Sequence, residues 1–290
     1  MEKLCVNSNI YVAEEKPKKL RLPRYKKQKA MIDINKSHLY HYTSFESAVK
    51  ILTSGKLRFS AYKNVNDINE SCGPVVLYAN KEDEKKVEAM LKYYLQLSFS
   101  MDKVGKRAGY DIPAMWGHYA ESGHGVCLAF DSDKIGQNVL ERRLYSNAVE
   151  YSNGRSLNEL VYDSKLHGDA ATFIRKAKDS IFFHKSEDWA YEQEYRAIAI
   201  SDETPLELDI KNCLVGVILF ARTAEEFISS VERAALSRIT DVDIYRYSTS
   251  LRGGGLFDAD GNDLNPPLNY DFSDVIKSLS NNKQTDYENQ

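Results

Sequence analysis

Residues 191–200 read YEQEYRAIAI, so a charged segment is followed directly by an apolar one. Successive side chains of a strand point to opposite faces, and a strand here would place Glu192, Glu194 and Arg196 on one face. Two carboxylates and a guanidinium are costly to bury unless they pair or take part in chemistry. This segment is therefore the strongest candidate for a functional site. The alternative is a solvated edge strand whose face carries a Glu–Arg pair.

The composition is that of a globular protein, with 42% hydrophobic and 11% aromatic residues among 290. This length allows one large domain or two small ones. The four cysteines are widely spaced and show no C-x-x-C motif, which argues against a disulfide framework and a zinc knuckle. No apolar run approaches a membrane span, and the N-terminus lacks the apolar core of a signal peptide. We therefore expect a cytoplasmic, thiol-reduced protein with no membrane partner.

Charge and composition divide the chain into three parts. Residues 16–29 carry eight Lys and Arg and no acid, so we predict a basic, partly disordered arm over 1–35. This arm is either a solvated tail or an electrostatic contact for nucleic acid or an acidic partner. Residues 36–250 are predicted to form a single α+β domain, and the turn-rich, polar residues 251–290 a C-terminal tail.

The patterns within the domain predict strands and helices in irregular order. A strand over 37–42 leads into a helix that Thr43 and Glu46 begin as a capping box and Gly55 ends. Further strands are predicted over 56–60, 126–131, 143–151, 192–200, 206–210, 214–220 and 242–247, and helices over 81–99, 157–184 (broken at Gly168) and 223–236. This irregular order, without a glycine-rich dinucleotide fingerprint, favours a mixed α+β domain over a doubly wound sheet.

Two further blocks accompany the acidic segment. His41 lies where a strand meets a helix, close to the free N–H groups of the helix N-terminus. Trp116 and Tyr119 lie one helical turn apart, before a glycine turn that leads into the strand at 126–131. The six histidines show no zinc spacing, and the chain has no P-loop, G-x-S-x-G or kinase motif, so we predict no metal site. Each block alone is more often structural, but three of them at strand ends favour a shared site.

Four stretches resemble the bacterial domain-of-unknown-function family 2971. They are LYHYTSFESAVKILTSGKLRFS (39–60), the amide- and acid-rich loop over 64–70, MWGHYAESGHGVCLAF (115–130) and DWAYEQEYRAI (188–198), and the resemblance covers about residues 38–220. The order of the blocks is also similar to that of divergent ADP-ribosyltransferases. That superfamily places a His or Arg on its first strand, an aromatic or Ser block in the middle, and a catalytic Glu on a later strand. The resemblance implies an α+β fold with a mixed, curved, split β-sheet, inserted helices and NAD held in its cleft.

The same resemblance implies which residues bind NAD. His41, in the block His41-Tyr42-Thr43, would hydrogen-bond a ribose of NAD. Tyr119, with Trp116 one turn before it, would stack on the nicotinamide ring.

It also implies roles for the charged residues. Glu194 would bond the ribose 2′-OH and stabilise the positive charge that forms as nicotinamide leaves. Glu192 would orient or deprotonate the acceptor. Members of the superfamily with His on the first strand normally carry one Glu, whereas a Glu-x-Glu pair belongs to the branch with Arg on the first strand. Which of Glu192 and Glu194 is catalytic therefore stays open, and we expect it to be Glu194. Arg196 would bind a phosphate or neutralise the pair.

The resemblance therefore implies an NAD-consuming ADP-ribosyltransferase, a toxin or phage-defence effector for which an antitoxin protein is an expected partner. The basic arm and the 19 tyrosines favour a nucleic-acid acceptor, RNA or DNA, with a protein acceptor as the next alternative. A non-catalytic module that binds RNA, DNA or a partner protein stays open, as does a hydrolase built on His41 and the glutamates.

Overall fold

The structure is a computed structural model that describes residues 37–62, 76–103, 107–152, 160–203, 205–220, 242–250 and 253–258, together with 223, 229–231, 234, 262 and 264. The predicted arm over 1–35, the loop over 64–70, most of the predicted helix over 223–236 and most of the tail lie outside the described residues.

The described chain is a mixed α+β domain, as the sequence predicted. The strands of its main sheet are β1 (His38–Thr43), β3 (Ser60–Ala61), β5 (Tyr94–Met101), β6 (Val126–Asp131), β7 (Tyr145–Ala148), β11 (Glu194–Ile200), β13 (Leu214–Phe220), β14 (Asp243–Ser250) and β15 (Gly253–Phe257). Smaller two-stranded sheets pair β2 (Lys56–Arg58) with β12 (Glu207–Asp209), β4 (Val76–Tyr78) with β9 (Leu160–Tyr162), and β8 (Glu150–Ser152) with β10 (His184–Ser186). The helices are α1 (Phe45–Ser54), α3 (Lys81–Leu91), α4 (Pro113–Tyr119), α5 (Ser132–Glu141), α6 (Ser164–His167), α7 (Ala170–Lys176) and α8 (Lys178–Phe182), with the 3-10 turns η1 (Glu121–Gly123) and η2 (Glu187–Glu192).

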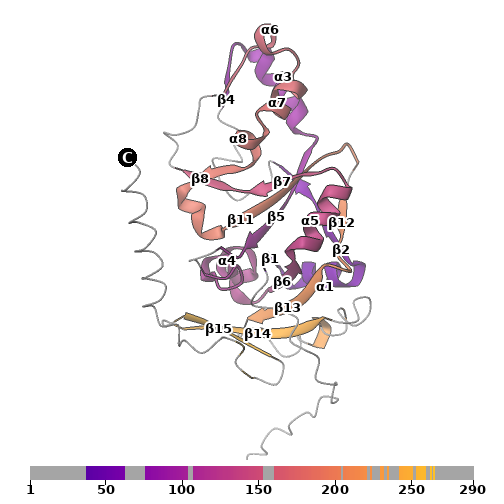
Figure 1. The fold of residues 1–290 in the computed structure, drawn as a ribbon, viewed down its shortest axis with the longest axis vertical. Helices are drawn as coiled ribbons and strands as arrows, with labels where there is room; N and C mark the ends of the chain where they lie inside the picture. Colours follow the sequence, from indigo (N-terminus) through magenta and orange to yellow (C-terminus); the bar gives the residue numbers. More distant parts are fainter. Residues whose placement is uncertain are drawn as a thin grey trace, which may run out of the picture. The chain divides into compact units, whose positions relative to one another are not determined.

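The main sheet has the strand order β15-β14-β13-β6-β1-β5-β11-β7, and β3 also pairs with β5 (Figure 1). Its β13–β14 pair is parallel and the other neighbours are antiparallel, so the sheet is mixed. The described strands end at β15 on one side and β7 on the other, and the sheet does not close into a barrel.

The sheet has a gap between β1 and β5. β1 pairs with β6 over six residue pairs but with β5 over only two, Leu39↔Met101 and Tyr40↔Ser100. Further along the same edge, β5 pairs with β3 at Gln96 and Leu95. Between these two ladders, no described strand pairs with this edge of β5, and the backbone around Ser98 faces an opening.

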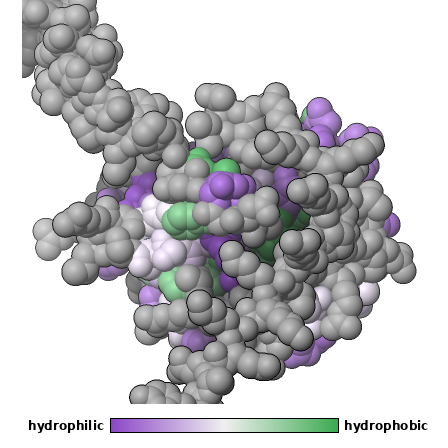
Figure 2. Space-filling view, turned by 90° about the horizontal axis from the view of Figure 1, so that it is seen from below, coloured by the Kyte–Doolittle hydropathy of each residue, from purple (hydrophilic) through white to green (hydrophobic). Residues whose placement is uncertain are grey.

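Alternation along β1 and β5 separates two packed faces. One face carries Leu39, Leu97 and Phe99, and the apolar sides of α1 and α5 cover it. The other face carries Tyr40 and Tyr42, against which α4 packs, and towards β11 it continues into a cluster that includes α3, α7 and α8. On the side shown in Figure 2, both apolar and hydrophilic residues of the described chain are visible at the surface.

The predicted helix over 81–99 is wrong in its second half. α3 ends at Leu91, and Tyr94–Met101 form β5, one of the inner strands of the sheet. The spacing of the apolar residues from Val87 to Leu95 fits a helix, but Leu95, Leu97 and Phe99 also alternate with polar residues. Seven residue pairs with β11 decide the strand, and that partner lies about a hundred residues away in the sequence.

The acidic segment is also not one continuous strand. Residues up to Glu192 belong to η2, Gln193 adopts a left-handed conformation with φ of 48°, and β11 begins only at Glu194. The residue that caps α1 is Ser44 and not Thr43, because Thr43 still belongs to β1 and the Ser44 hydroxyl accepts from the Ser47 N–H.

Other observed boundaries differ from the predicted ones because strands pair with segments that are distant in the sequence. The predicted strand over 143–151 is divided between β7 and β8, which belong to different sheets, and the predicted strand over 56–60 is divided between β2 and β3. The described part of the predicted helix over 157–184 begins with strand β9 and ends in β10, although Gly168 does break the helical part between them. Past residue 250, where a tail was predicted, β15 pairs with β14. The end of α1 at Gly55 and the strands β6 and β13 are confirmed.

Candidate functional site

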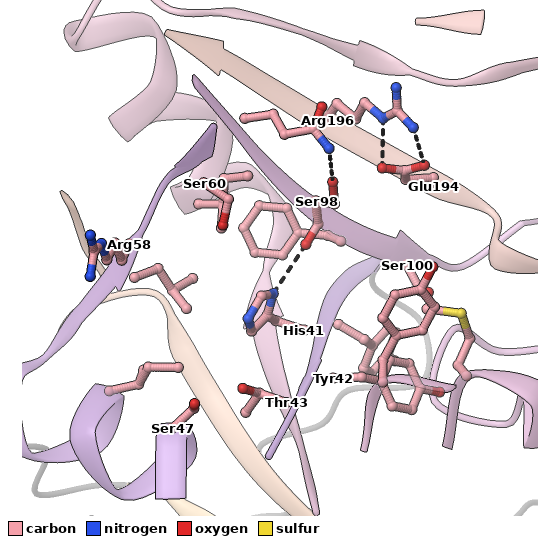
Figure 3. Close-up of a pocket in the computed structure, with 18 of the residues that line it drawn as sticks. His41, Tyr42, Thr43, Ser47, Arg58, Ser60, Ser98, Ser100, Glu194 and Arg196 are labelled. Atoms are coloured by element: carbon pink, nitrogen blue, oxygen red, sulfur yellow. Dashed lines mark hydrogen bonds and ion pairs between the residues drawn. The ribbon is translucent and has the colours of Figure 1, made fainter. Parts of the chain in front are cut away.

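A cleft of about 720 Å³ opens at the gap between β1 and β5. It is lined from both faces of the sheet, because His41 lies on the Leu39 face whereas Glu194 lies on the Tyr40 face. Figure 3 shows His41 on one side of the β5 ribbon and the Glu194–Arg196 pair on the other. The cleft therefore extends around the unpaired edge of β5 from one face of the sheet to the other. Side chains from both faces line it, which a continuous sheet would prevent.

His41 occupies the gap itself. Its Nδ1 lies 3.1 Å from the carbonyl oxygen of Ser98, and since a carbonyl only accepts, Nδ1 carries the proton. Burial lowers the pKa of the imidazole, and the hydrogen bond to Ser98 opposes this only in part. The ring is therefore neutral near pH 7, and its Nε2 is an acceptor.

Glu194 and Arg196 form a buried, two-pronged ion pair. Arg196 Nε and Nη2 donate to the two carboxylate oxygens at 2.6 and 2.8 Å, and Nη1 donates to the carbonyl of Phe182 at 2.8 Å. Burial acts to raise the pKa of the Glu194 carboxyl, but Arg196, together with Lys185 and Ser98, outweighs it and lowers the pKa. Glu194 is thus ionised, and its orientation is fixed by two parallel hydrogen bonds.

Glu192 lies in a different environment. Its Oε2 accepts from Lys185 Nζ at 2.7 Å, and its Oε1 accepts from the Tyr119 hydroxyl at 2.7 Å. Burial raises the pKa of the Glu192 carboxyl, and the attraction of Lys185 reduces that shift without cancelling it. Lys185 Nζ also lies 3.7 Å from Glu194 Oε2, so one ammonium contacts both acids.

The local backbone explains how the two acids come together. The left-handed turn at Gln193 interrupts the alternation between Glu192 and Glu194, and the Gln193 side chain holds it by donating to the carbonyls of Met101 and Arg107 at 3.2 and 2.8 Å. Lys185 reaches the acids from β10, where it is paired with Tyr151 of β8. The Tyr151 hydroxyl accepts from the Glu194 backbone N–H at 2.8 Å, so the small β8–β10 sheet supports both acids.

The far end of the cleft is cationic. Lys50, Lys56 and Arg58 line it, together with hydroxyl groups of Thr43 and Ser47. The two lysines form exposed ion pairs with Glu46 and Glu207, and Arg58 has no side-chain partner among the described residues. Glu207 also lines the cleft, so this end carries a small net positive charge, and the two buried acids lie at the other end.

Most residues proposed from the sequence line this cleft. They are His41, Tyr42, Thr43, Tyr119, Glu192, Glu194 and Arg196. Tyr42 is largely a core residue, however, because it is buried and its hydroxyl donates to the Gly109 carbonyl at 2.7 Å. The donors of Arg196 are directed at Glu194 and Phe182, an arrangement that favours neutralising the pair over binding a phosphate.

Trp116 is not among the residues that line the cleft. It is buried against Tyr247, with ring centroids 5.4 Å apart and ring planes 7° apart, and its indole N–H donates to the Tyr110 carbonyl. On α4 the residues that face the cleft are Met115 and Tyr119, which are four positions apart and share one side of the helix. The prediction that Trp116 contacts a ligand therefore assigned it to the wrong side of the helix.

Sequence reasoning missed Gln96, Ser98, Arg58 and Lys185, which also line the cleft. The two β5 residues were recoverable, because polar residues at 96, 98 and 100 alternate with apolar ones at 95, 97 and 99. No local pattern indicated Lys185, since its importance depends on where β10 pairs.

Residues 115–197 match the model of a family described as "Protein of unknown function (DUF2971)". This stretch contains Tyr119, Lys185, Glu192, Glu194 and Arg196, and it supports the family resemblance over that part of the chain. His41 and the cationic end of the cleft lie before it. Searches of curated proteins and of solved structures found no match.

Two further properties concern the described residues only. None of their helices is both long enough and apolar enough to cross a membrane. Their His, Cys, Asp and Glu side chains form no group of three placed to hold a metal ion.

Proposed function

We propose that the protein is an ADP-ribosyltransferase that uses NAD as its donor substrate. The observation that carries the proposal is the buried acid pair at one end of the cleft. Glu192 and Glu194 contact the same ammonium at 2.7 and 3.7 Å, yet the pKa of Glu192 is raised and that of Glu194 is lowered. Neighbouring carboxyl groups whose pKa values are displaced in opposite directions are suited to different roles, one as a fixed charge and one as a proton carrier.

The shape and polarity of the cleft support a dinucleotide ligand. Its volume of about 720 Å³ falls within the roughly 300–1,000 Å³ typical of small-molecule sites. The cationic end at Lys50, Lys56 and Arg58 suits a diphosphate, and the Nε2 of neutral His41 accepts a hydrogen bond from a ribose hydroxyl. The gap in the sheet also supports the split-sheet fold of ADP-ribosyltransferases.

In this proposal Glu194 supplies fixed negative charge. The bond between ribose C1′ and the nicotinamide nitrogen breaks with its electron pair leaving on nicotinamide, and positive charge develops on the ribose. Glu194 stabilises that charge electrostatically and accepts a hydrogen bond from the 2′-OH. Its two hydrogen bonds from Arg196 use one lone pair on each oxygen and hold the carboxylate in one orientation.

Glu192 acts on the acceptor. As the acceptor nitrogen or oxygen bonds to C1′, its proton passes to the Glu192 carboxylate, and the raised pKa makes that carboxylate a better base than an ordinary one. Tyr119, whose hydroxyl holds Glu192 in place, also offers its ring to nicotinamide.

A nucleic-acid acceptor is favoured by rings close to Glu192. Tyr191 lies 6.5 Å from the exposed His118 and 6.0 Å from Trp189, measured between ring centroids, and aromatic rings stack well on unpaired bases. The basic run over 16–29 would add contacts to phosphates. A protein acceptor is the alternative, and a role as a toxin or phage-defence effector follows from either.

The test is incubation of the protein with labelled NAD and RNA, DNA or cell lysate. Wild type is expected to release nicotinamide and transfer label, and Glu194→Gln is expected to lose at least a hundredfold in rate, the size of effect seen when one charge-stabilising group is removed. Glu150→Gln, an exposed carboxylate on β8, serves as the matched control and should behave as wild type. Absence of label transfer and of nicotinamide release under every condition would exclude the enzyme.

A non-catalytic binding module is the second candidate. It is favoured by one observation, namely that every oxygen of the two carboxylates already accepts a hydrogen bond within the protein. In that case NAD is not consumed, and Glu194→Gln changes stability while nucleic-acid binding by the full chain is unchanged.

A further inference from the structure

Lys185 is a buried lysine in the cleft, and only 4% of its side chain is exposed. Its ammonium lies 2.7 Å from Glu192 Oε2, 3.7 Å from Glu194 Oε2 and 4.7 Å from the centre of the Trp189 ring. Burying an ammonium is costly, and the pairing with Glu192 offsets that cost only if the carboxylate is charged. The two groups therefore favour each other's ionised forms.

We infer that Lys185 is a positioning residue that keeps Glu192 ionised and oriented for proton acceptance. Arg196 commits three of its nitrogens to Glu194 and the Phe182 carbonyl. Among the described residues, Lys185 is the ion-pair partner of Glu192. Without it, Glu192 is a buried acid next to the anionic Glu194, and both conditions favour the protonated form, which cannot accept a proton.

The surroundings of Glu192 make this dependence specific. The charged and titratable groups that interact with it are Lys185 on β10, Glu194 on β11, Tyr119 on α4, Tyr151 on β8 and Tyr191 on its own turn. Tyr119 contributes a neutral hydrogen bond, and Arg196 is already neutralised by Glu194. The protonation of Glu192 thus depends most strongly on one cation.

The kinetic part of the inference rests on the proposed transferase function, but the protonation of Glu192 does not. The first measurement is therefore a carbon-13 NMR titration of protein labelled at the glutamate carboxyl groups, with Glu192→Gln to assign the resonance. In Lys185→Gln and Lys185→Met the Glu192 midpoint is expected to rise by about 1–3 pH units, the size of the effect of an adjacent opposite charge. Lys185→Arg should keep the midpoint within about 0.5 units of wild type, because it retains the charge.

Lys178→Gln is the matched control, because Lys178 also pairs with an acid, Asp179, and lies 5.9 Å from an aromatic ring, that of Tyr145. It lies outside the cleft and should leave the midpoint unchanged. An unchanged midpoint in a folded Lys185→Gln or Lys185→Met variant overturns the inference. If neither variant folds, the wild-type protein decides through the NMR coupling across the hydrogen bond from the Lys185 ammonium to the Glu192 carboxylate, and absence of that coupling at pH 7 overturns the inference.

The second measurement is the pH dependence of transfer and of nicotinamide release to water. In the charge-removing variants, the acidic limb of the transfer profile should move up by the same amount of about 1–3 units, while that of release, which depends on Glu194, should move less, because Arg196 still pairs with Glu194 at 2.6 and 2.8 Å. If the transfer rate of these variants falls by the same factor at every pH and the acidic limb stays at the wild-type pH, the role of Lys185 is merely structural and the inference is overturned. If wild type releases no nicotinamide, the transferase proposal fails, and the titration of Glu192 still tests Lys185.

Discussion

Replacing Arg196 with methionine removes the charge that neutralises Glu194 while keeping most of the apolar volume. Arg196 is 1% exposed and makes two hydrogen bonds to the carboxylate and one to the Phe182 carbonyl. Among the described residues, the cation that then remains close to the buried Glu194 is Lys185, at 3.7 Å. Breaking a buried pair by removing one partner costs about 3–5 kcal/mol. We expect a loss of this size in the free energy of unfolding at pH 7.

The pH dependence of this loss follows from the pKa of Glu194. In wild type the pKa is lowered by Arg196, so the pair stabilises the fold above the ordinary value of about 4.3 and that stabilisation is lost as the pH falls through the lowered pKa. In Arg196→Met, burial without the guanidinium raises the pKa, so stability is instead lost as the pH rises through the raised value. The difference between the two proteins should therefore shrink as the pH is lowered from 7 to 4.5.

Urea unfolding at pH 7 and 4.5 measures both effects. Adding Glu194→Gln to the variant removes the unpaired charge, and a double-mutant cycle should give a coupling of about 2–3 kcal/mol. Lys50→Met, which breaks an ion pair whose partners are 72% and 78% exposed, should unfold as wild type does. A loss below about 1 kcal/mol in Arg196→Met, or one that the second substitution does not relieve, would refute the buried pair as described.

Two further predictions concern two glycines near the cleft and His41. Gly125→Ala should destabilise the protein by about 1–3 kcal/mol or more, because the added methyl group would collide with the backbone of Thr43 and Ala120. Gly117→Ala, on the open side of α4, should be neutral or stabilising by up to about 1 kcal/mol, and equal thermal shifts for the two variants would contradict this difference. For His41, a nitrogen-15 NMR spectrum should show a neutral ring at pH 6.5 with the proton on Nδ1, because burial lowers the pKa below its ordinary value of about 6.5. An imidazolium signal, or a proton on Nε2, would rule out the assigned role.

The chemical character of the candidate site was readable in the sequence. Glu192, Glu194 and Arg196 stood out because three charged groups directly precede an apolar run, and such a segment must be paired or used wherever it is buried. The end of α1 at Gly55 and the strands β6 and β13 were also predicted, since each depends on a local signal: a left-handed glycine, or a short apolar run bounded by turns. These features are properties of a few consecutive residues.

The elements that escaped prediction depend on distant partners. Tyr94–Met101 fits a helix and a strand almost equally well by spacing, and its pairing with β11 and β1 decides between them. The gap between β1 and β5 has no sequence signal, because it arises where two strands stop pairing while each keeps its other neighbour. The cleft, and the meeting of His41 with the acids across β5, follow from that gap.

The roles of single residues also depend partly on local sequence and partly on tertiary packing. Trp116 and Tyr119 are both aromatic and lie one turn apart, but the packing of α4 against β1 buries Trp116 and leaves Tyr119 at the cleft. Lys185 is one of 39 Lys and Arg in the chain, and only the pairing of β10 with β8 brings it to the acids. Local sequence specifies which chemical groups are present, and long-range strand pairing specifies which of them meet, because the energy of a buried charge depends on neighbours that are distant along the chain.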